Sequence, residues 1–298
     1  VTIFGESAGS QDVSLLLAAP AAQGLFRAAI MQSGTPGFGM TYRSLEEAFK
    51  LGDQLDEQAQ SGGDIERLRE LSPVALLQIQ SKLGEPATRG ADFTWLRTTI
   101  DGSVLPEEPE KLLARAAPKP VIIGTNAIEF GPDKGSVDLN EFSRFWFGRN
   151  AAQGRAAYEA EEAAGPSPRR GHLELRMQSD AQFHCPGNKL ADLLAGMDWP
   201  VWRYEFDVGP NGGPTRHALE IGYIFDRKPV GGGVQLQDYW VALAKGLDPN
   251  AKLPDAWKRP KWNRTEADDP RTLVLGEKTS QMVKSLPRAS FCAFSDAF

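Results

Sequence analysis

The sequence of 298 residues contains no run of eighteen apolar residues, so none of its segments is expected to span a membrane. Its 33 lysine and arginine residues are scattered and the formal net charge is −6, which argues against a nucleic-acid partner. Cysteine and histidine are scarce, with two and three copies, and they lack the spacing of metal ligands. We therefore expect neither a metal ion nor a cofactor. The composition, 41% hydrophobic, is sufficient for one large core.

The pattern G-x-S-x-G occurs at residues 5–9, directly after a short apolar and β-branched run. A stretch rich in small residues and leucine, residues 8–17, follows it. This context predicts a strand that turns sharply into a helix, with a serine held at the turn. We expect that only the hydrogen side chains of Gly5 and Gly9 leave room for the neighbouring segments. Ser7 is therefore the candidate nucleophile.

The wider passage, residues 4–20 and 24–34, closely resembles the type-B carboxylesterase and cholinesterase-like family of α/β-hydrolases. The resemblance implies an α/β-hydrolase fold, in which a mostly parallel central sheet is flanked by helices. It also implies that Ser7 attacks an ester carbonyl and that the backbone amide of Ala8 is one donor of the oxyanion hole. Residues 32–34 would end the next strand of the sheet.

A serine nucleophile needs a base, because its hydroxyl reacts poorly until a neighbour takes its proton. His172 lies in a charged stretch typical of a solvated loop or a helix start, and His184 lies beside a cysteine. His217 follows a glycine-rich loop after an aromatic, alternating strand at residues 201–206, a common position for a base. The residues alone leave His217 and His184 as equal candidates. The resemblance favours His217, since the family carries its catalytic histidine in a segment similar to residues 217–225.

The acid that orients the base should lie between the serine and the histidine, which is the chain order of α/β-hydrolases. Residues 121–131 supply an apolar strand, a turn and then Glu129, and the resemblance maps Glu129 onto the family's triad glutamate. The match departs from the family's Asp-Glu-Gly, because Ile128 replaces the aspartate and Phe130 separates Glu129 from the glycine. The expected role of Glu129 is to accept from the imidazole and stabilise the imidazolium. Asp133 is the nearest rival.

The chain begins four residues before Gly5, whereas the family's second oxyanion donor comes from a glycine-rich loop well upstream of the serine. The earlier strands of the sheet are likewise expected upstream. We therefore expect residues 1–298 to be the C-terminal part of a single α/β-hydrolase catalytic domain, without its N-terminal strands. An N-terminal segment or companion chain would supply the remaining strands and the oxyanion hole, and the isolated chain should not be a competent enzyme.

The middle of the chain predicts helical insertions around residues 40–90 and 139–197, which would form the lid and gorge wall of the family. The clearest helix begins at the N-cap Ser44 and continues to Leu55 with one apolar face. Further helices are predicted over residues 65–71, 73–83, 139–164 and 173–197. Four aromatic residues could line an acyl or alcohol pocket, but packing in the core is the favoured prediction for each of them: Phe142, Phe145, Trp146 and Phe147.

Cys185 and Cys292 occupy places that resemble those of a disulfide in cholinesterase-like proteins, and the resemblance implies that they pair. The bond would close a loop of about a hundred residues, which is worth roughly 4 to 5 kcal/mol in the chain-entropy model. A disulfide suggests export, so a secreted or periplasmic location is favoured over the cytoplasm. The alternative is a pair of buried thiols in a cytosolic enzyme.

These features predict a serine carboxylesterase that hydrolyses a small-molecule ester through an acyl-serine intermediate. His217 would take the proton from Ser7, return it to the leaving alcohol and then activate water, while Glu129 holds the imidazole. An amide or carbamate hydrolase with the same triad is the nearer alternative, because leaving-group preference depends on the shape of the pocket. A non-catalytic, adhesion-type member of the family is the other.

Overall fold

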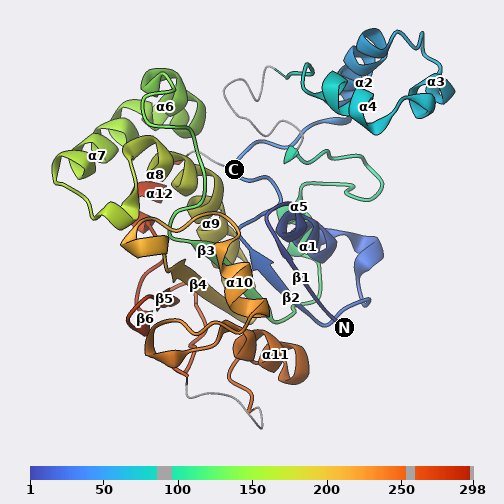
Figure 1. Cartoon of the computed structure of the whole chain (residues 1–298). Helices are drawn as coiled ribbons and strands as arrows, with labels where there is room; N and C mark the ends of the chain where they lie inside the picture. Colours follow the sequence, from blue (N-terminus) through green and yellow to red (C-terminus); the bar gives the residue numbers. More distant parts are fainter. Residues whose placement is uncertain (86–95, 253–258, 296–298) are drawn as a thin grey trace.

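The computed structural model describes residues 1–85, 96–252 and 259–295, and within them six strands form one sheet (Figure 1). In chain order, which is also their order across the sheet, they are β1 (Thr2–Glu6), β2 (Ala28–Gln32), β3 (Val121–Asn126), β4 (Val201–Asp207), β5 (Thr272–Gly276) and β6 (Ser280–Val283). The first five are parallel and β6 is antiparallel to β5. The mostly parallel sheet that the sequence predicts is therefore confirmed.

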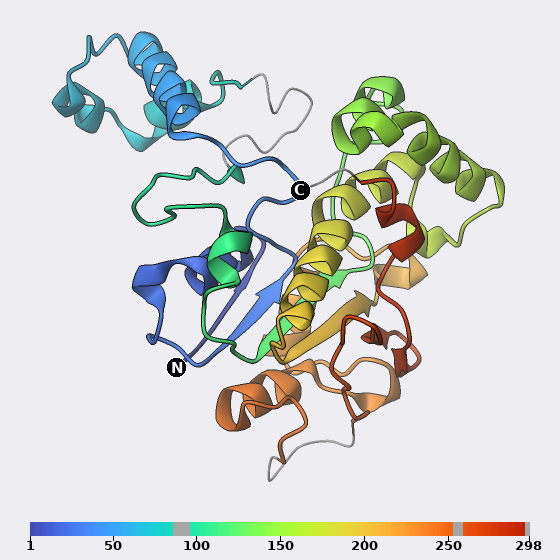
Figure 2. The same ribbon diagram turned by 180° about the vertical axis from the view of Figure 1, so that it is seen from behind.

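Helices cover both faces of this sheet, as Figures 1 and 2 show from opposite sides. One face packs against α1 (Ala8–Ala18), α5 (Pro109–Leu113) and α9 (Cys185–Gly196), and the other against α10 (Leu219–Phe225) and α11 (Leu236–Gly246). Successive residues of β3 alternate between the two cores: Val121 and Ile123 join the first, and Ile122 joins the second. Because both faces are covered, β2 and β3 are largely apolar, whereas β4 also carries the buried Arg203 and Glu205. The parallel strands end at one edge, so the loops after β1, β3 and β4 meet there.

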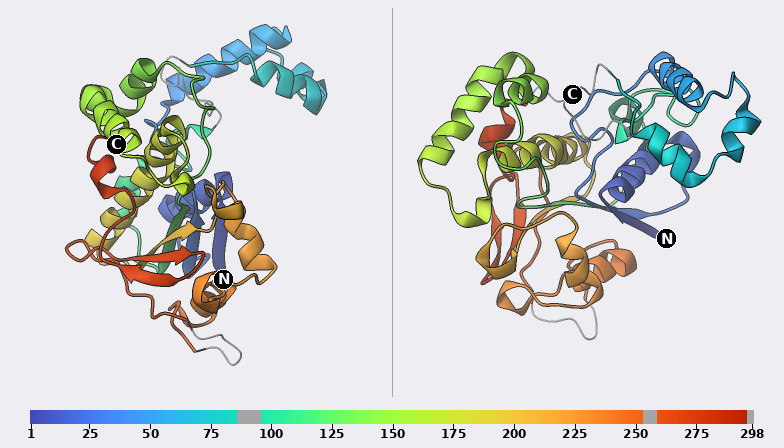
Figure 3. Two further views of the ribbon diagram at one scale, coloured as in Figure 1. Left: turned by 60° about the vertical axis from the view of Figure 1, so that its left-hand side comes forward. Right: turned by 45° about the horizontal axis from the view of Figure 1, so that its top comes forward.

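Helices form where the sequence predicts the first insertion, although residues 86–90 lie outside the described residues. They are α2 (Leu45–Ala59), α3 (Ile65–Glu70) and α4 (Pro73–Gln80). Ser44 caps α2 in a capping box with Glu47, as its position before the apolar face predicts. Figures 1 and 3 show the three helices projecting from the body, and none of their residues is buried. Their service as a lid stays a prediction.

The second insertion consists of α6 (Leu139–Phe147), α7 (Ala151–Ala163), α8 (Leu173–Ser179) and a π-helical turn, Asp180–His184, that leads into α9. Phe142, Trp146 and Phe147 are buried in one apolar cluster of this region, and Phe145 packs against it. Core packing is therefore the use that the structure shows for these rings. That these rings line a substrate pocket stays a prediction. That the helices of this insertion form a gorge wall stays a prediction as well.

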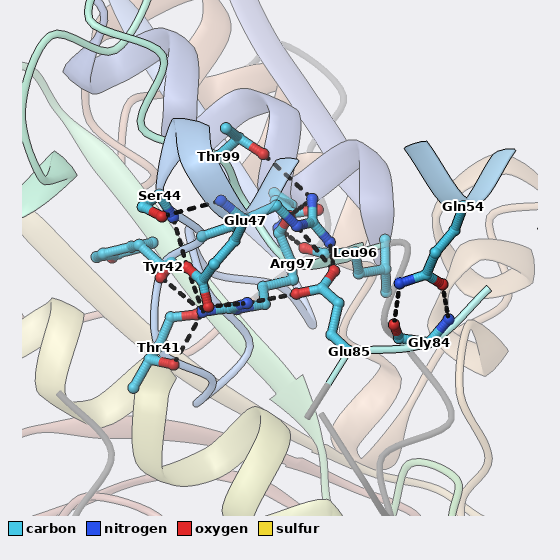
Figure 4. A network of polar contacts seen from close by, with 12 residues as sticks. Thr41, Tyr42, Ser44, Glu47, Gln54, Gly84, Glu85, Leu96, Arg97 and Thr99 are labelled. Carbon is cyan, nitrogen blue, oxygen red and sulfur yellow. Dashed lines mark hydrogen bonds and ion pairs between the residues drawn. The ribbon is translucent and has the colours of Figure 1, made fainter. Parts of the chain in front are cut away.

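A buried ion network ties the projecting helices to the body (Figure 4). The carboxylate of Glu85 accepts hydrogen bonds from both Arg43 and Arg97, and its side chain is only 5% exposed. Arg97 also donates to Glu47 of α2 at 3.1 Å and to the backbone carbonyl of Thr41 at 2.8 Å. One carboxylate thus joins the segments that enter and leave the projecting unit, and its loss would leave two buried guanidinium groups with fewer partners.

Replacing Glu85 with glutamine is expected to destabilise the projecting unit by about 3 kcal/mol, because the variant removes the negative partner of two buried arginine residues. Hydrogen exchange of α2 and α4 amides should accelerate, whereas exchange in α1 should not change. Glu46→Gln is the matched control, since the ion pair of Glu46 with Lys50 is exposed to solvent and is expected to contribute little. Equal exchange rates in the two variants would contradict this role of Glu85.

The predicted disulfide is confirmed: Cys185 at the start of α9 is bonded to Cys292 in α12 (Ala289–Cys292), with an S–S distance of 2.03 Å. The two residues are 107 positions apart, so the bond fastens the C-terminal region to the helix that precedes β4. Across the described residues, no helix combines the length and the apolar character that crossing a membrane requires.

Candidate active site

Ser7 occupies the sharp turn between β1 and α1, with φ 57° and ψ −121°. This left-handed φ is strained for a non-glycine residue, and such strain is typical of functional positions. A Cβ on Gly5 would lie 2.3 Å from the carbonyl oxygen of Gly9, so only glycine fits at position 5. The expectation for Gly9 was wrong, because a Cβ there would meet no described atom within 4 Å. The second steric constraint falls on Gly34, where a Cβ would lie 2.4 Å from the carbonyl oxygen of Ser7.

The backbone amide of Ala8 lies at the N-terminus of α1, directly after Ser7. The first amides of a helix have no acceptor within the helix, and the helix dipole favours negative charge at this end. Ser7 donates its own amide to the carbonyl of Gln32 at 2.9 Å, which holds the turn against the end of β2. The local geometry therefore suits the amide of Ala8 for donation to an oxyanion beside Ser7.

Glu129 and His217 are brought together by the loops that follow β3 and β4. Nδ1 of His217 lies 2.7 Å from Oε2 of Glu129, whose side chain is fully buried. The other carboxylate oxygen accepts from the amide of Asn126 at 2.8 Å, and the amide of His217 donates to the carbonyl of Glu129 at 3.2 Å. Burial lowers the pKa of His217, but the hydrogen bond and the charge of Glu129 outweigh it, and the pKa is raised. The pair is thus built to hold a protonated imidazole.

Glu6, inside the same G-x-S-x-G pattern, is a site residue that the sequence analysis missed. Its Oε1 lies 3.2 Å from Nε2 of His217. Burial raises the pKa of Glu6 to about 7, although the charge of His217 opposes this. Among the described residues Nε2 has no hydrogen-bond partner, so its hydrogen bond with Ser7 is not formed in this structure. Hydrogen bonds of this kind often form only in the substrate complex.

Glu220 is a second buried carboxylate near this pair that the sequence analysis missed. It accepts from Nε2 of Gln32 at 3.0 Å and from Nδ2 of Asn126 at 2.8 Å. Its pKa is raised, first by burial and then by the charge of Glu129. The closeness of His217 and Glu220 in the sequence was visible, but the contacts of Glu220 with β2 and β3 depend on the assembled sheet.

The rival candidates have other partners, although His172 and Asp133 line one pocket with Glu129 and His217. His184 is completely buried, 3.1 Å from Oγ1 of Thr125, and burial is the main cause that lowers its pKa well below the ordinary value. Nδ1 of His172 is paired with Glu174 at 3.0 Å. Asp133 is exposed and its backbone carbonyl accepts from Ser136. Of the three histidines, therefore, His217 is the one paired with Glu129.

An open pocket of about 430 Å³ adjoins the pair, lined by Glu129, Phe130, Leu175, Pro214 and His217 among others. No group of three or more histidine, cysteine, aspartate or glutamate residues with the geometry of a metal site occurs in the described part of the chain. The groups that the structure brings to this sheet edge are a serine hydroxyl, an imidazole, carboxylates and a helix N-terminus.

A strained serine after β1 and a Glu–His pair after β3 and β4, at the carboxyl edge of one parallel sheet, are the arrangement of α/β-hydrolases. The model of the carboxylesterase family matches residues 1–295, and the chain belongs to that family. The family and the fold class that the sequence predicts are thus confirmed.

Several characterised proteins are similar to this chain. Para-nitrobenzyl esterase of Bacillus subtilis (strain 168) is 31% identical over 301 residues, which cover 92% of this chain and 58% of that protein. Human cocaine esterase is 36% identical, with 86% of this chain and 51% of that protein covered. A solved structure of PNB esterase matches all of this chain and 62% of its own, with a TM-score of 0.74 and 25% identity. The chain therefore spans about half to three-fifths of the length of these relatives.

Proposed function

We propose that this chain carries the nucleophile, acid and base of a serine carboxylesterase. The observation that carries the proposal is the 2.7 Å pairing of Glu129 with His217 at the sheet edge where Ser7 is held in a strained turn. Three residues in the chain order serine, acid, histidine then provide the triad of this fold. The similarity to proteins named as esterases favours an ester as substrate.

The reaction proceeds by acyl transfer to the serine. Nε2 of His217 accepts the proton of Ser7 as its oxygen attacks the ester carbonyl, and the amide of Ala8 donates to the resulting oxyanion. The imidazolium, stabilised by Glu129, then gives the proton to the leaving alcohol, and an acyl-serine remains. Water, activated by the same imidazole, hydrolyses this intermediate and restores Ser7. No step requires a cofactor.

The substrate class is a small carboxylic ester. An amide or carbamate hydrolase would use the same residues, but the esterase names of the relatives do not favour it. An adhesion-type role is also disfavoured, because such proteins typically lose the serine or the histidine and this chain retains candidates for all three roles. The Cys185–Cys292 disulfide supports a secreted or periplasmic location, since disulfides persist in oxidising compartments.

The proposal is tested by labelling the full natural protein with a fluorophosphonate probe, followed by peptide mapping with mass spectrometry. The label is expected on Ser7, and Ser7→Ala should abolish both labelling and hydrolysis of p-nitrophenyl butyrate. Ser81→Ala is the control, because Ser81 is exposed at the C-terminal end of α4, a helix of the projecting unit. A folded protein that neither takes the label nor hydrolyses the ester would overturn the proposal.

Glu6→Gln is expected to shift the acidic limb of the pH profile of kcat/KM towards lower pH. After burial, which lowers the pKa of His217, and Glu129, which raises it, the charge of Glu6 is the next influence and raises it further. Removal of that charge lowers the pKa, so the imidazole is neutral and can act as a base at lower pH. Glu66→Gln, on exposed α3, should leave the profile unchanged. An unshifted limb in Glu6→Gln would contradict the contact with Nε2.

A further inference from the structure

Two phenyl rings enclose the imidazole of His217. The Phe130 ring centroid lies 4.6 Å from that of the imidazole with an interplanar angle of 88°, and the Phe183 centroid lies 5.1 Å away with an angle of 55°. The two phenyl rings also contact each other edge to face, at 5.1 Å and 78°. Aromatic pairs at such distances and angles are favourable, so the three rings form one packed unit.

Phe183 reaches this position from the π-helical turn Asp180–His184 between α8 and α9. A π-helical turn inserts one extra residue and changes the direction of the side chains, and such turns are frequent at functional sites. Phe183 is 1% exposed, and Phe38 contacts it edge to face with ring centroids 5.6 Å apart. The ring therefore has little freedom to move away from His217.

Buried polar contacts fix both ends of this turn. Asp180 accepts from Nε of Arg288 at 2.8 Å and from the hydroxyl of Tyr158 at 2.7 Å. At the other end, His184 lies within hydrogen-bond distance of Thr125, and the next residue, Cys185, is held by the disulfide. A buried carboxylate and a buried histidine that take no part in the proposed chemistry thus support the turn that carries Phe183.

Phe130 is fixed differently, because it directly follows Glu129 in the loop after β3. The amide of Glu129 donates to Oγ of Ser179 at 3.1 Å, and its carboxylate is bonded to Asn126 and His217. The loop that supplies the acceptor for Nδ1 therefore also supplies one wall for the imidazole. The ring and the carboxylate constrain the same imidazole from different directions.

We propose that Phe130 and Phe183 are positioning residues for His217, an inference that rests on the proposed esterase function. A hydrogen bond at Nδ1 alone leaves the imidazole free to tilt, and Nε2 already lies 3.2 Å from Glu6. The two rings limit that tilt and so restrict the directions in which Nε2 can point.

The test compares Phe130→Leu and Phe183→Leu in the full natural protein. Each is expected to lower kcat for p-nitrophenyl butyrate about 10- to 100-fold, with KM changed less than about threefold, because a misplaced base slows the chemical step. The low-field proton NMR signal of His217 Nδ1–H should broaden in both variants. Phe130→Tyr, which keeps the ring, should restore kcat to near the wild-type value.

Phe206→Leu is the matched control, because Phe206 is a fully buried residue of β4 whose ring contacts Tyr223. It should lose stability as Phe183→Leu does, and keep kcat and the low-field signal. The inference is overturned if Phe130→Leu and Phe183→Leu keep kcat within threefold, or if Phe206→Leu loses as much kcat. Failure of the proposed function would be distinct, since the wild-type protein would then show neither Ser7 labelling nor ester hydrolysis.

Discussion

Replacement of His217 with alanine is expected to lower kcat for ester hydrolysis by roughly 10⁴- to 10⁶-fold, the loss typical when the base of a serine triad is removed. His217 is the histidine that contacts Glu129, at 2.7 Å, and Glu6, at 3.2 Å. His184 is completely buried and bonded to the loop after β3, so it cannot substitute. The measurement is the steady-state rate with p-nitrophenyl butyrate, together with the rate of fluorophosphonate labelling.

His172→Ala provides the matched control, because it removes an imidazole that lines the same pocket but is paired with Glu174 rather than with Glu129. It should retain kcat within a few-fold. Glu129→Gln should fall between the two, with a loss of about 10⁴-fold, since the amide favours the wrong tautomer of the imidazole. If His217→Ala kept more than a tenth of the wild-type kcat, the assignment of the base would have to be abandoned.

The second large effect is expected from the double variant Cys185→Ser/Cys292→Ser. The disulfide closes a loop of 107 positions, and its removal should cost roughly 4 to 5 kcal/mol because the unfolded chain regains entropy. For a domain of this size the loss corresponds to a fall in Tm of roughly 10 °C. Urea unfolding monitored by circular dichroism would measure the change.

Dithiothreitol is the internal control for this prediction. It should lower the stability of the wild-type protein to that of the double variant and leave the variant unchanged. The single variant Cys185→Ser should match the double variant, because one thiol alone cannot form the bond. A loss below about 1 kcal/mol would mean that the contacts of α12 hold the C-terminal region without the bond.

The turn at Ser7 could be predicted because its steric constraints involve residues close together in the sequence. The order of the candidate residues Ser7, Glu129 and His217 could be predicted because it is the chain order of the fold. The clash at Gly5 involves atoms of residues 9 and 10, which follow closely in the chain, so a local sequence pattern carries it. The constraint on Gly34 was not predicted, because it depends on how β2 lies beside the turn. The same limit applies to Glu6, whose contact with His217 joins the ends of β1 and a loop after β4.

The C-terminal strands were also missed. β5 has five residues, as β1 and β2 do, but those two strands flank the G-x-S-x-G pattern, whereas no motif adjoins β5 or the four-residue β6. The aromatic rings around His217 were not predicted either. Their arrangement depends on the π-helical turn Asp180–His184, whose extra residue has no signature in the sequence.

The support of this turn has a consequence for the order of events during synthesis. Ser7 leaves the ribosome among the first residues of this sequence, whereas Arg288 and Cys292, which hold the two ends of the turn, leave almost three hundred residues later. At typical elongation rates of about 5–20 residues per second, this interval lasts many seconds. A nascent chain can fold its first strands and helices during that time, but its base acquires a fixed position only afterwards. Under the proposed function, the full rate would therefore be reached only once synthesis has passed Cys292.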